Sequence, residues 1–140
     1  MSTRIDCPRL GRRGIAALEF ALLAPVFVTL LLSTADVANR VQTSLRLEGA
    51  ARAGAQYAAA NASDMGEIRN RVIAAWPELT LADVPLPTLA CECAAAPVAC
   101  HVQCQGGMVK TITVTAQRTL TPFLLQTMAQ GQGNAVIRLR

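Results

Sequence analysis

The chain has 140 residues, of which 52% are hydrophobic and 16% charged, and its formal net charge is +4. This length accommodates one membrane helix and one small domain but no second globular core, and the apolar fraction is high for a soluble domain. The basicity is concentrated at the start of the chain, and removal of residues 1–14 leaves 9 basic and 8 acidic side chains. A nucleic-acid-binding surface is therefore not expected.

Residues 15–32 form an apolar run in which Glu19 is the only charged residue. As a helix rising about 1.5 Å per residue, this run covers roughly 27 Å, close to the hydrocarbon core of a bilayer. A charge at bilayer depth costs roughly 2.5–3.5 kcal/mol, so an acid here indicates a functional role. The alternative is that Glu19 lies near the membrane surface and reaches the headgroups, although Glu reaches less far than Lys or Arg.

Four arginines precede the apolar run, and this asymmetry predicts a single-pass protein with a cytoplasmic N-terminus. They are Arg4, Arg9, Arg12 and Arg13. Everything after about Asp36 is then delivered to the oxidising side of the membrane. Pro25 removes one backbone hydrogen bond and is expected to kink the membrane half of the helix, which lipid-embedded helices tolerate.

The helical pattern continues beyond the membrane, because no proline occurs between Pro25 and Pro77. Val37, Val41 and Leu45 recur at intervals of four residues, which predicts an amphipathic stalk over residues 37–61. The small residues at positions 50–55 permit close helix approach, although alanine also has a high intrinsic helix propensity. We therefore expect one helix over residues 15–60, divided into a transmembrane part (15–36) and the stalk.

Residues 62–140 are expected to form a small domain that begins with a short helix. Asp64 and Glu67 resemble a capping box, and Pro77 ends the helix just after Trp76, which we expect to be a packing anchor. The apolar face of this helix consists of Ile68, Val72 and Ile73.

Strands are expected in the second part of this domain. Residues 109–120 alternate between apolar side chains and threonines, as in a half-buried strand, and residues 135–139 predict a second strand paired antiparallel to the first. Residues 78–89 are expected to be an extended connector, and residues 121–125 a short turn or helical piece. The predicted fold class is α+β: a long membrane helix and stalk followed by a small disulfide-stapled antiparallel β domain with one short helix.

Four cysteines, Cys91, Cys93, Cys100 and Cys104, lie within a 14-residue span. With the adjacent His101 they provide enough ligands for zinc, but they lack the paired C-x2-C knuckles of common zinc modules. On the predicted oxidising side of the membrane, disulfides are favoured and no metal is expected. Cys91 and Cys93 are poorly placed to pair with each other, so each is expected to join Cys100 or Cys104, in either arrangement.

An enzymatic function has little support in the sequence. There is one histidine, no phosphate-binding loop, and no Ser or Cys motif with a base within reach. We therefore expect neither catalytic residues nor a cofactor.

The N-terminal segment resembles a type IV prepilin, which has a short basic leader ending in Gly, a cut after this Gly, and Glu at the fifth mature position. Here residues 1–14 would be the leader, Gly14 and Ile15 the processing site, and Glu19 the fifth residue. Cleavage would leave an α-ammonium group on Ile15, one helical turn from Glu19. Glu19 would pair with this group on its own chain or on a neighbouring subunit, which lowers the cost of both charges in lipid.

Two blocks narrow this resemblance to the TadE-like pseudopilins of tight-adherence (Flp) pilus systems. They are residues 17–22 (ALEFAL) followed by Pro25, and residues 47–55 (LEGAARAGA). The resemblance covers about the first 58 residues. It implies a minor pilin-like component of the bacterial inner membrane with a periplasmic C-terminal domain. The partners that it implies are a prepilin peptidase, other pilins or pseudopilins, and pilus assembly proteins.

The rival interpretation is a secreted, cysteine-stapled binding protein. Residues 33–35 (STA) would then form the cleavage site of an ordinary signal peptide, and the mature chain would begin at Asp36. This interpretation gives Glu19 no role, since an acid only weakens the apolar core of a signal peptide. A lipoprotein anchored at Cys7 is not expected, because no apolar run precedes that cysteine and it would be lost with the leader.

Overall fold

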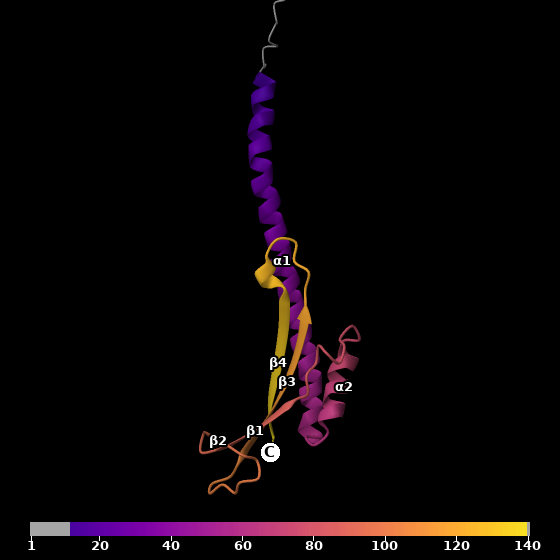
Figure 1. Ribbon diagram of the computed structural model, residues 1–140, viewed down its shortest axis with the longest axis vertical. Coiled ribbons are helices and arrows are strands. Elements are labelled where there is room, and N and C mark those ends of the chain that lie inside the picture. The colour runs from indigo at the N-terminus through magenta and orange to yellow at the C-terminus, as the bar shows by residue number, and fades with distance from the viewer. Residues whose placement is uncertain (1–11, 140) are drawn as a thin grey trace, which may run out of the picture.

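A long helix that projects far beyond a small α+β domain dominates the computed structural model, which describes residues 12–139, with side chains from Ala16 onward (Figure 1). The predicted residues Arg4, Arg9 and Cys7 lie outside the described residues. The elements in chain order are α1 (Arg12–Ala60), α2 (Met65–Ala75), β1 (Thr88–Cys93), β2 (Ala96–Val98), β3 (Val109–Thr119), the 3-10 helix η1 (Gln126–Met128) and β4 (Gln130–Leu139). The predicted α+β fold class is confirmed.

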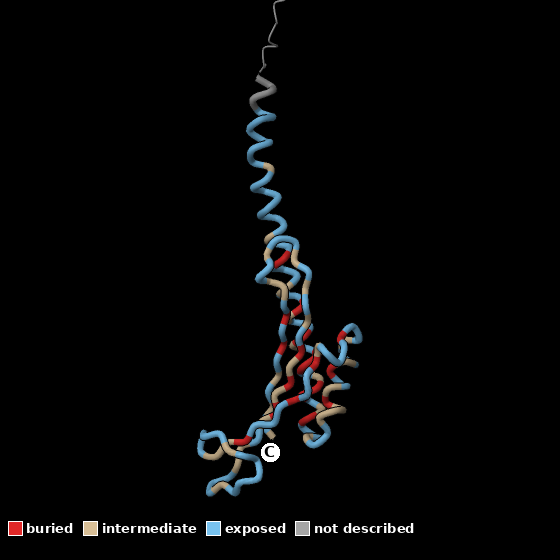
Figure 2. Tube along the Cα trace, viewed as in Figure 1, coloured by how far each residue is buried: buried red, intermediate tan, exposed pale blue. Residues whose placement is uncertain are grey.

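Helix α1 has 49 residues and continues through Pro25 without interruption. Its N-terminal half is exposed along its length, whereas its C-terminal half lies against the sheet and α2 (Figure 2). The predicted helix over residues 15–60 is thus confirmed at its C-terminal end and begins three residues earlier than expected. One continuous helix joins the projecting segment to the core of the domain.

The four strands form one antiparallel sheet in the order β2-β1-β3-β4. Strand β3 matches the predicted strand, and its inward-facing Ile112, Val114 and Ala116 are fully buried. Strand β4 pairs antiparallel with β3 as predicted, but it begins at Gln130 rather than at residue 135. Its first residues, Gln-Gly-Gln-Gly-Asn, carry no apolar alternation, and only pairing with β3 makes them a strand.

Strand β1 lies partly within the segment that was expected to be a connector, and β2 was not predicted. The two strands form a tight hairpin through Ala94 and Ala95, both of which have positive φ angles of 49° and 66°. Alanine rarely occupies this conformation, and hairpin turns of this kind usually carry Asn or Gly. The sequence therefore lacked the normal turn signal for this hairpin.

The sheet packs directly on the C-terminal half of α1, and glycines make the contact close. A Cβ atom on Gly133 would lie closer than 3.0 Å to the backbone of Leu47 and Glu48. Further along α1, a Cβ on Gly54 would meet the Val72 side chain of α2. The predicted role of the small residues around position 54 in close helix approach is confirmed here.

The buried face of α1 differs from the predicted apolar stripe. Val37, Val41 and Leu45 are 42%, 53% and 63% exposed, so this part of the apolar stripe does not face the core. Positions four residues apart advance about 40° around a helix of 3.6 residues per turn, so this short series drifts away from the core. The residues that face the core are mostly small: Asp36, Thr43, Leu47, Ala50, Ala51, Gly54, Ala55 and Ala58.

Helix α2 is capped as predicted, with the Asp64 carboxylate accepting a hydrogen bond from the backbone N–H of Glu67 at 2.9 Å. Ile68 and Val72 are fully buried against α1, and Ile73 is partly buried. The helix ends at Ala75, and Trp76 is partly buried against the core with the Arg118 guanidinium 5.0 Å from the centroid of its ring. Trp76 is therefore a packing residue, as expected.

Candidate membrane segment and its junction with the domain

The N-terminal half of α1 is long and apolar enough to cross a membrane, and none of its most apolar window is buried. Its large side chains point outward on all sides; the most exposed are Phe20 (72%), Leu31 (70%) and Leu22 (69%). A helix that is apolar around its whole circumference is stable only in an apolar environment. This segment therefore fits a single membrane span.

The hydroxyl groups within and just after the apolar run are satisfied inside the helix itself. Thr29 donates to the carbonyl of Val26 at 2.9 Å, Ser33 donates to that of Thr29 at 2.7 Å, and Thr34 donates to that of Leu30 at 2.7 Å. Such bonds remove the cost of placing a hydroxyl in lipid, where water is not available as a partner. These residues are consequently compatible with the membrane.

The predicted processing and assembly residues lie at the projecting end of α1, away from the domain. Gly14 and Ile15 are in the first turn of the helix, and Glu19 follows one turn later with its side chain exposed. Four residues correspond to about 6 Å along a helix axis, so the backbone nitrogen of Ile15 and the Glu19 side chain share one face. Pro25 lies between these residues and the domain.

Asp36 connects the helix to the β3–β4 loop, and the sequence did not indicate this role. Its side chain is buried, and its carboxylate accepts hydrogen bonds from three successive backbone N–H groups. Those of Phe123, Leu124 and Leu125 donate at 2.7, 2.8 and 2.9 Å. Backbone N–H groups have no sequence signature. The sequence therefore showed an acid one turn beyond Leu32 but not its hydrogen-bond partners. We call this arrangement the Asp36 clasp.

The clasp fixes the loop at the point where α1 enters the domain. Next to it, Arg40 donates a hydrogen bond to the Met128 sulfur of η1 at 2.9 Å. Beyond η1, the Leu120 N–H donates to the Ala129 carbonyl at 2.7 Å and closes the base of the loop. The loop is therefore held both to the helix and to itself, whereas the side chains of Phe123 and Leu124 remain 72% and 45% exposed.

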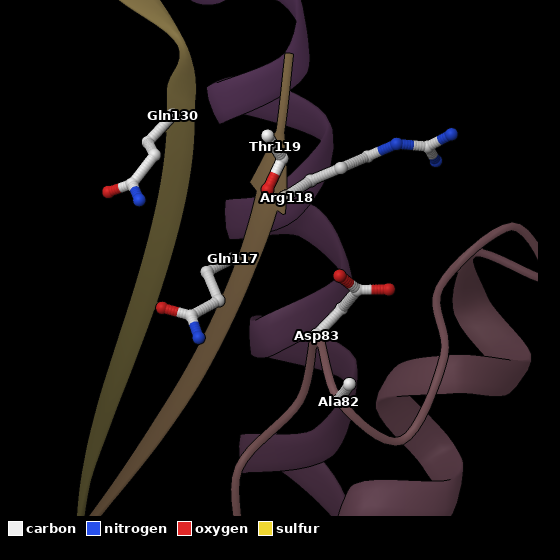
Figure 3. A pocket seen from close by; sticks show the side chains of 6 residues that line it. All are labelled: Ala82, Asp83, Gln117, Arg118, Thr119 and Gln130. Carbon is white, nitrogen blue, oxygen red and sulfur yellow. The ribbon is translucent and has the colours of Figure 1, made fainter.

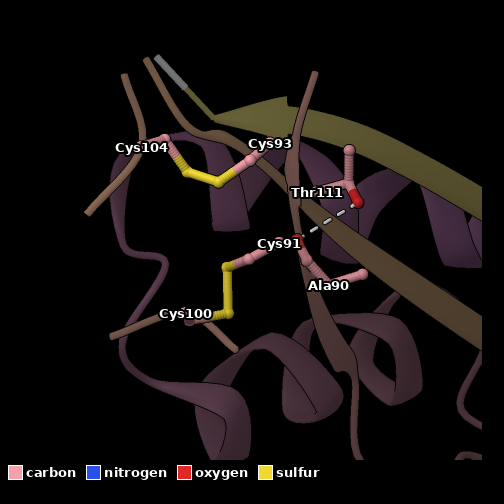
Figure 4. The surroundings of a disulfide bond; sticks show 6 residues. All are labelled: Ala90, Cys91, Cys93, Cys100, Cys104 and Thr111. Carbon is pink, nitrogen blue, oxygen red and sulfur yellow. Dashed lines mark hydrogen bonds between the residues drawn. A yellow bond between two sulfur atoms is a disulfide. The ribbon is translucent and has the colours of Figure 1, made fainter. Parts of the chain in front are cut away.

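The four C-terminal cysteines form two disulfides at the opposite end of the domain (Figure 4). Cys91 is bonded to Cys100 and Cys93 to Cys104, with Cα–Cα distances of 5.2 and 5.8 Å. The prediction that Cys91 and Cys93 each bond to Cys100 or Cys104 is confirmed, and the structure shows which of the two possible arrangements forms. His101 is exposed in the connecting loop, and no group of His, Cys, Asp and Glu able to hold a metal occurs among the described residues.

A small polar hollow of about 240 Å³ lies beside the sheet, and its groups serve the fold (Figure 3). Asp83 accepts hydrogen bonds from the hydroxyl and the backbone N–H of Thr80 at 2.7 and 2.8 Å. These two hydrogen bonds lower the pKa of Asp83 below its ordinary value of 3.8, and the bond from the Thr80 hydroxyl has the larger effect. Arg118, which also lines the hollow, forms an ion pair with Glu78 at 2.9 Å.

Comparison with known families supports the membrane-segment assignment. Residues 14–56 match the family model described as TadE-like protein. This match begins at the glycine of the predicted processing site and includes Glu19, Asp36 and all of the small-residue block at residues 47–55. No curated protein and no solved structure matches the chain. The resemblance to the TadE-like family is therefore confirmed over residues 14–56.

Proposed function

We propose that this protein is a minor pseudopilin of a tight-adherence pilus system, processed by a prepilin peptidase after Gly14. The observation that carries the proposal is the position of Glu19. It is the only acid in the apolar run at residues 15–32, five residues after the glycine at which the family match begins. An acid in such a segment is costly unless it has a partner.

The proposed mechanism is structural rather than catalytic. The four arginines near the N-terminus hold that end in the cytoplasm, and the disulfide-bonded domain lies in the periplasm. Peptidase cleavage then exposes the α-ammonium group of Ile15, which pairs with Glu19 of the same chain or of a neighbouring subunit. In the second case, the pairing also sets the axial register between two packed helices.

The proposal is tested by the mature N-terminus. Glycine has no side chain that would obstruct a narrow peptidase cleft, so Gly14→Leu is expected to leave the leader attached. Gly11→Leu is the matched control, because it makes the same change three residues upstream and should be processed normally. Intact-mass analysis of the membrane fraction, with and without the peptidase, distinguishes the products.

A mature chain that begins at Ile15 supports the proposal. A chain that begins at Asp36 would contradict it and would assign the protein to the secreted, signal-peptide class. An uncut chain in peptidase-competent cells would also contradict it, and it would leave the helix as an ordinary membrane anchor.

A further inference from the structure

We propose that the tip of the β3–β4 loop, formed by Phe123 and Leu124, inserts into the periplasmic lipid surface of the membrane. The inference rests on the proposed membrane span of α1. It assigns an apolar docking surface to lipid rather than to a protein partner.

The first observation is the depth of the loop. The apolar run ends at Leu32, and Asp36 lies four residues further along the same helix, or about 6 Å along its axis. The headgroup region adds roughly 5–7 Å on each side of the hydrocarbon core. Because the N–H of Phe123 is hydrogen-bonded to Asp36 at 2.7 Å, the loop lies at headgroup depth when the apolar run spans the core.

The second observation is the position of the loop on the domain. The β3–β4 loop lies at the end of the domain from which α1 projects (Figure 1). The two disulfides and the β1–β2 hairpin lie at the other end. Of the described domain, this loop is thus the part that reaches the membrane surface first.

The third observation is the contrast between backbone and side chains. Three consecutive N–H groups of the loop are used by one buried carboxylate, so the backbone is fixed. The Phe123 side chain nevertheless remains 72% exposed. Burying aromatic and aliphatic side chains at the headgroup–acyl boundary is favourable, in proportion to the apolar area removed from water.

The test uses tryptophan as a depth probe in the full-length chain, reconstituted into vesicles of phosphatidylethanolamine and phosphatidylglycerol. Three variants are compared: Phe123→Trp at the loop tip, Leu23→Trp near the middle of the apolar run, and Val136→Trp on β4. Val136 is 65% exposed and lies six residues beyond the start of β4, or roughly 20 Å along the strand. The emission of the single native tryptophan, Trp76, is measured in the unsubstituted chain and subtracted.

Two measurements are made on each variant: the emission wavelength, and quenching by lipids brominated close to the headgroup or close to the chain end. We expect Phe123→Trp to emit at short wavelength and to be quenched mainly by the shallow bromines. Leu23→Trp should be quenched mainly by the deep bromines, and Val136→Trp should be quenched by neither. If Phe123→Trp does not fold, Leu124→Trp replaces it, because the hydrogen bonds of the clasp involve only the backbone at both positions.

Three outcomes would overturn the inference. Quenching of Leu23→Trp alone would leave the span intact and show that the loop is in water. A short-wavelength Phe123→Trp signal that bromine does not quench, and that disappears as protein is diluted in lipid, would assign the loop to contact with a second copy. If Leu23→Trp is not quenched, the apolar run does not span the membrane, and the inference loses its premise.

Discussion

The two halves of helix α1 use opposite side chains for opposite environments. The first half presents large apolar residues, such as Phe20 and Leu22, to its surroundings in every direction. The second half buries alanines and glycines, such as Ala51 and Gly54, and exposes larger residues such as Val41. In lipid, a helix needs apolar bulk on its surface, whereas against a sheet it needs a smooth face that allows close approach.

The two halves of α1 also differ in purpose: the residues proposed for assembly lie in the N-terminal half, and those that stabilise the domain lie in the C-terminal half. Among the described side chains, those of residues 16–32, Glu19 included, are exposed or at most partly buried, so changes there should leave the stability of the domain intact. Changes at the small-residue face of the C-terminal half of α1 should destabilise the domain.

The largest loss of stability is expected for Gly133→Val. The added side chain would meet the backbone of Leu47 and Glu48, which cannot move without separating β4 from α1. Overpacking of this kind costs roughly 3 kcal/mol. Urea unfolding of the full-length protein in detergent, followed by circular dichroism, measures the change.

Gly49→Ala is the matched control for this substitution. Gly49 lies on α1, the helix that Gly133 contacts, but an added Cβ would have no neighbour within 4 Å. Replacing an exposed helical glycine with alanine should stabilise the protein by about 0.5–1 kcal/mol. Equal destabilisation by both variants would show that the β4 contact is not tight.

A smaller loss is expected when one disulfide is removed. Cys93→Ser opens the bridge to Cys104, which closes a loop with a sequence separation of 11 residues. Loss of a loop of this size should cost about 2–3 kcal/mol in the chain-entropy description. Alkylation followed by peptide mapping should find one new free thiol, at Cys104. A free thiol at Cys100 instead would show the alternative pairing.

A local effect is expected for Asp36→Ala. The substitution removes the acceptor of three loop N–H groups, so the amides of Phe123, Leu124 and Leu125 should exchange with solvent much faster than in the unsubstituted chain. Asp64→Ala is the control, since it removes a carboxylate cap from α2 and should accelerate exchange there instead. Unchanged exchange at the loop amides would show that the clasp does not hold the loop.

The smallest effect on stability is expected for Glu19→Ala. The domain should unfold at the same urea concentration, processing should continue, and insertion should become slightly easier, because an intramembrane charge is removed. Pilus formation should nevertheless be impaired if Glu19 pairs with the Ile15 amine. Normal piliation would reduce Glu19 to a residue that merely reaches the headgroups.

Local sequence signals determined the elements that depend on near neighbours. The apolar run at residues 15–32, the Asp64 cap and the threonine alternation in β3 each have a periodicity or spacing that predicts the element directly. The N-terminal resemblance followed in the same way, because its residues are consecutive or one helical turn apart. The cysteines also limited the disulfides to two arrangements.

Only the tertiary structure determined the features that depend on distant backbone. The start of β4 at Gln130 has no apolar pattern and exists because β3 supplies its hydrogen bonds. Which face of α1 is buried depended on the sheet, which selects small residues for contact rather than the Val37–Leu45 series. The Asp36 clasp likewise joins a side chain to main-chain donors 87 to 89 residues away, which no sequence pattern marks.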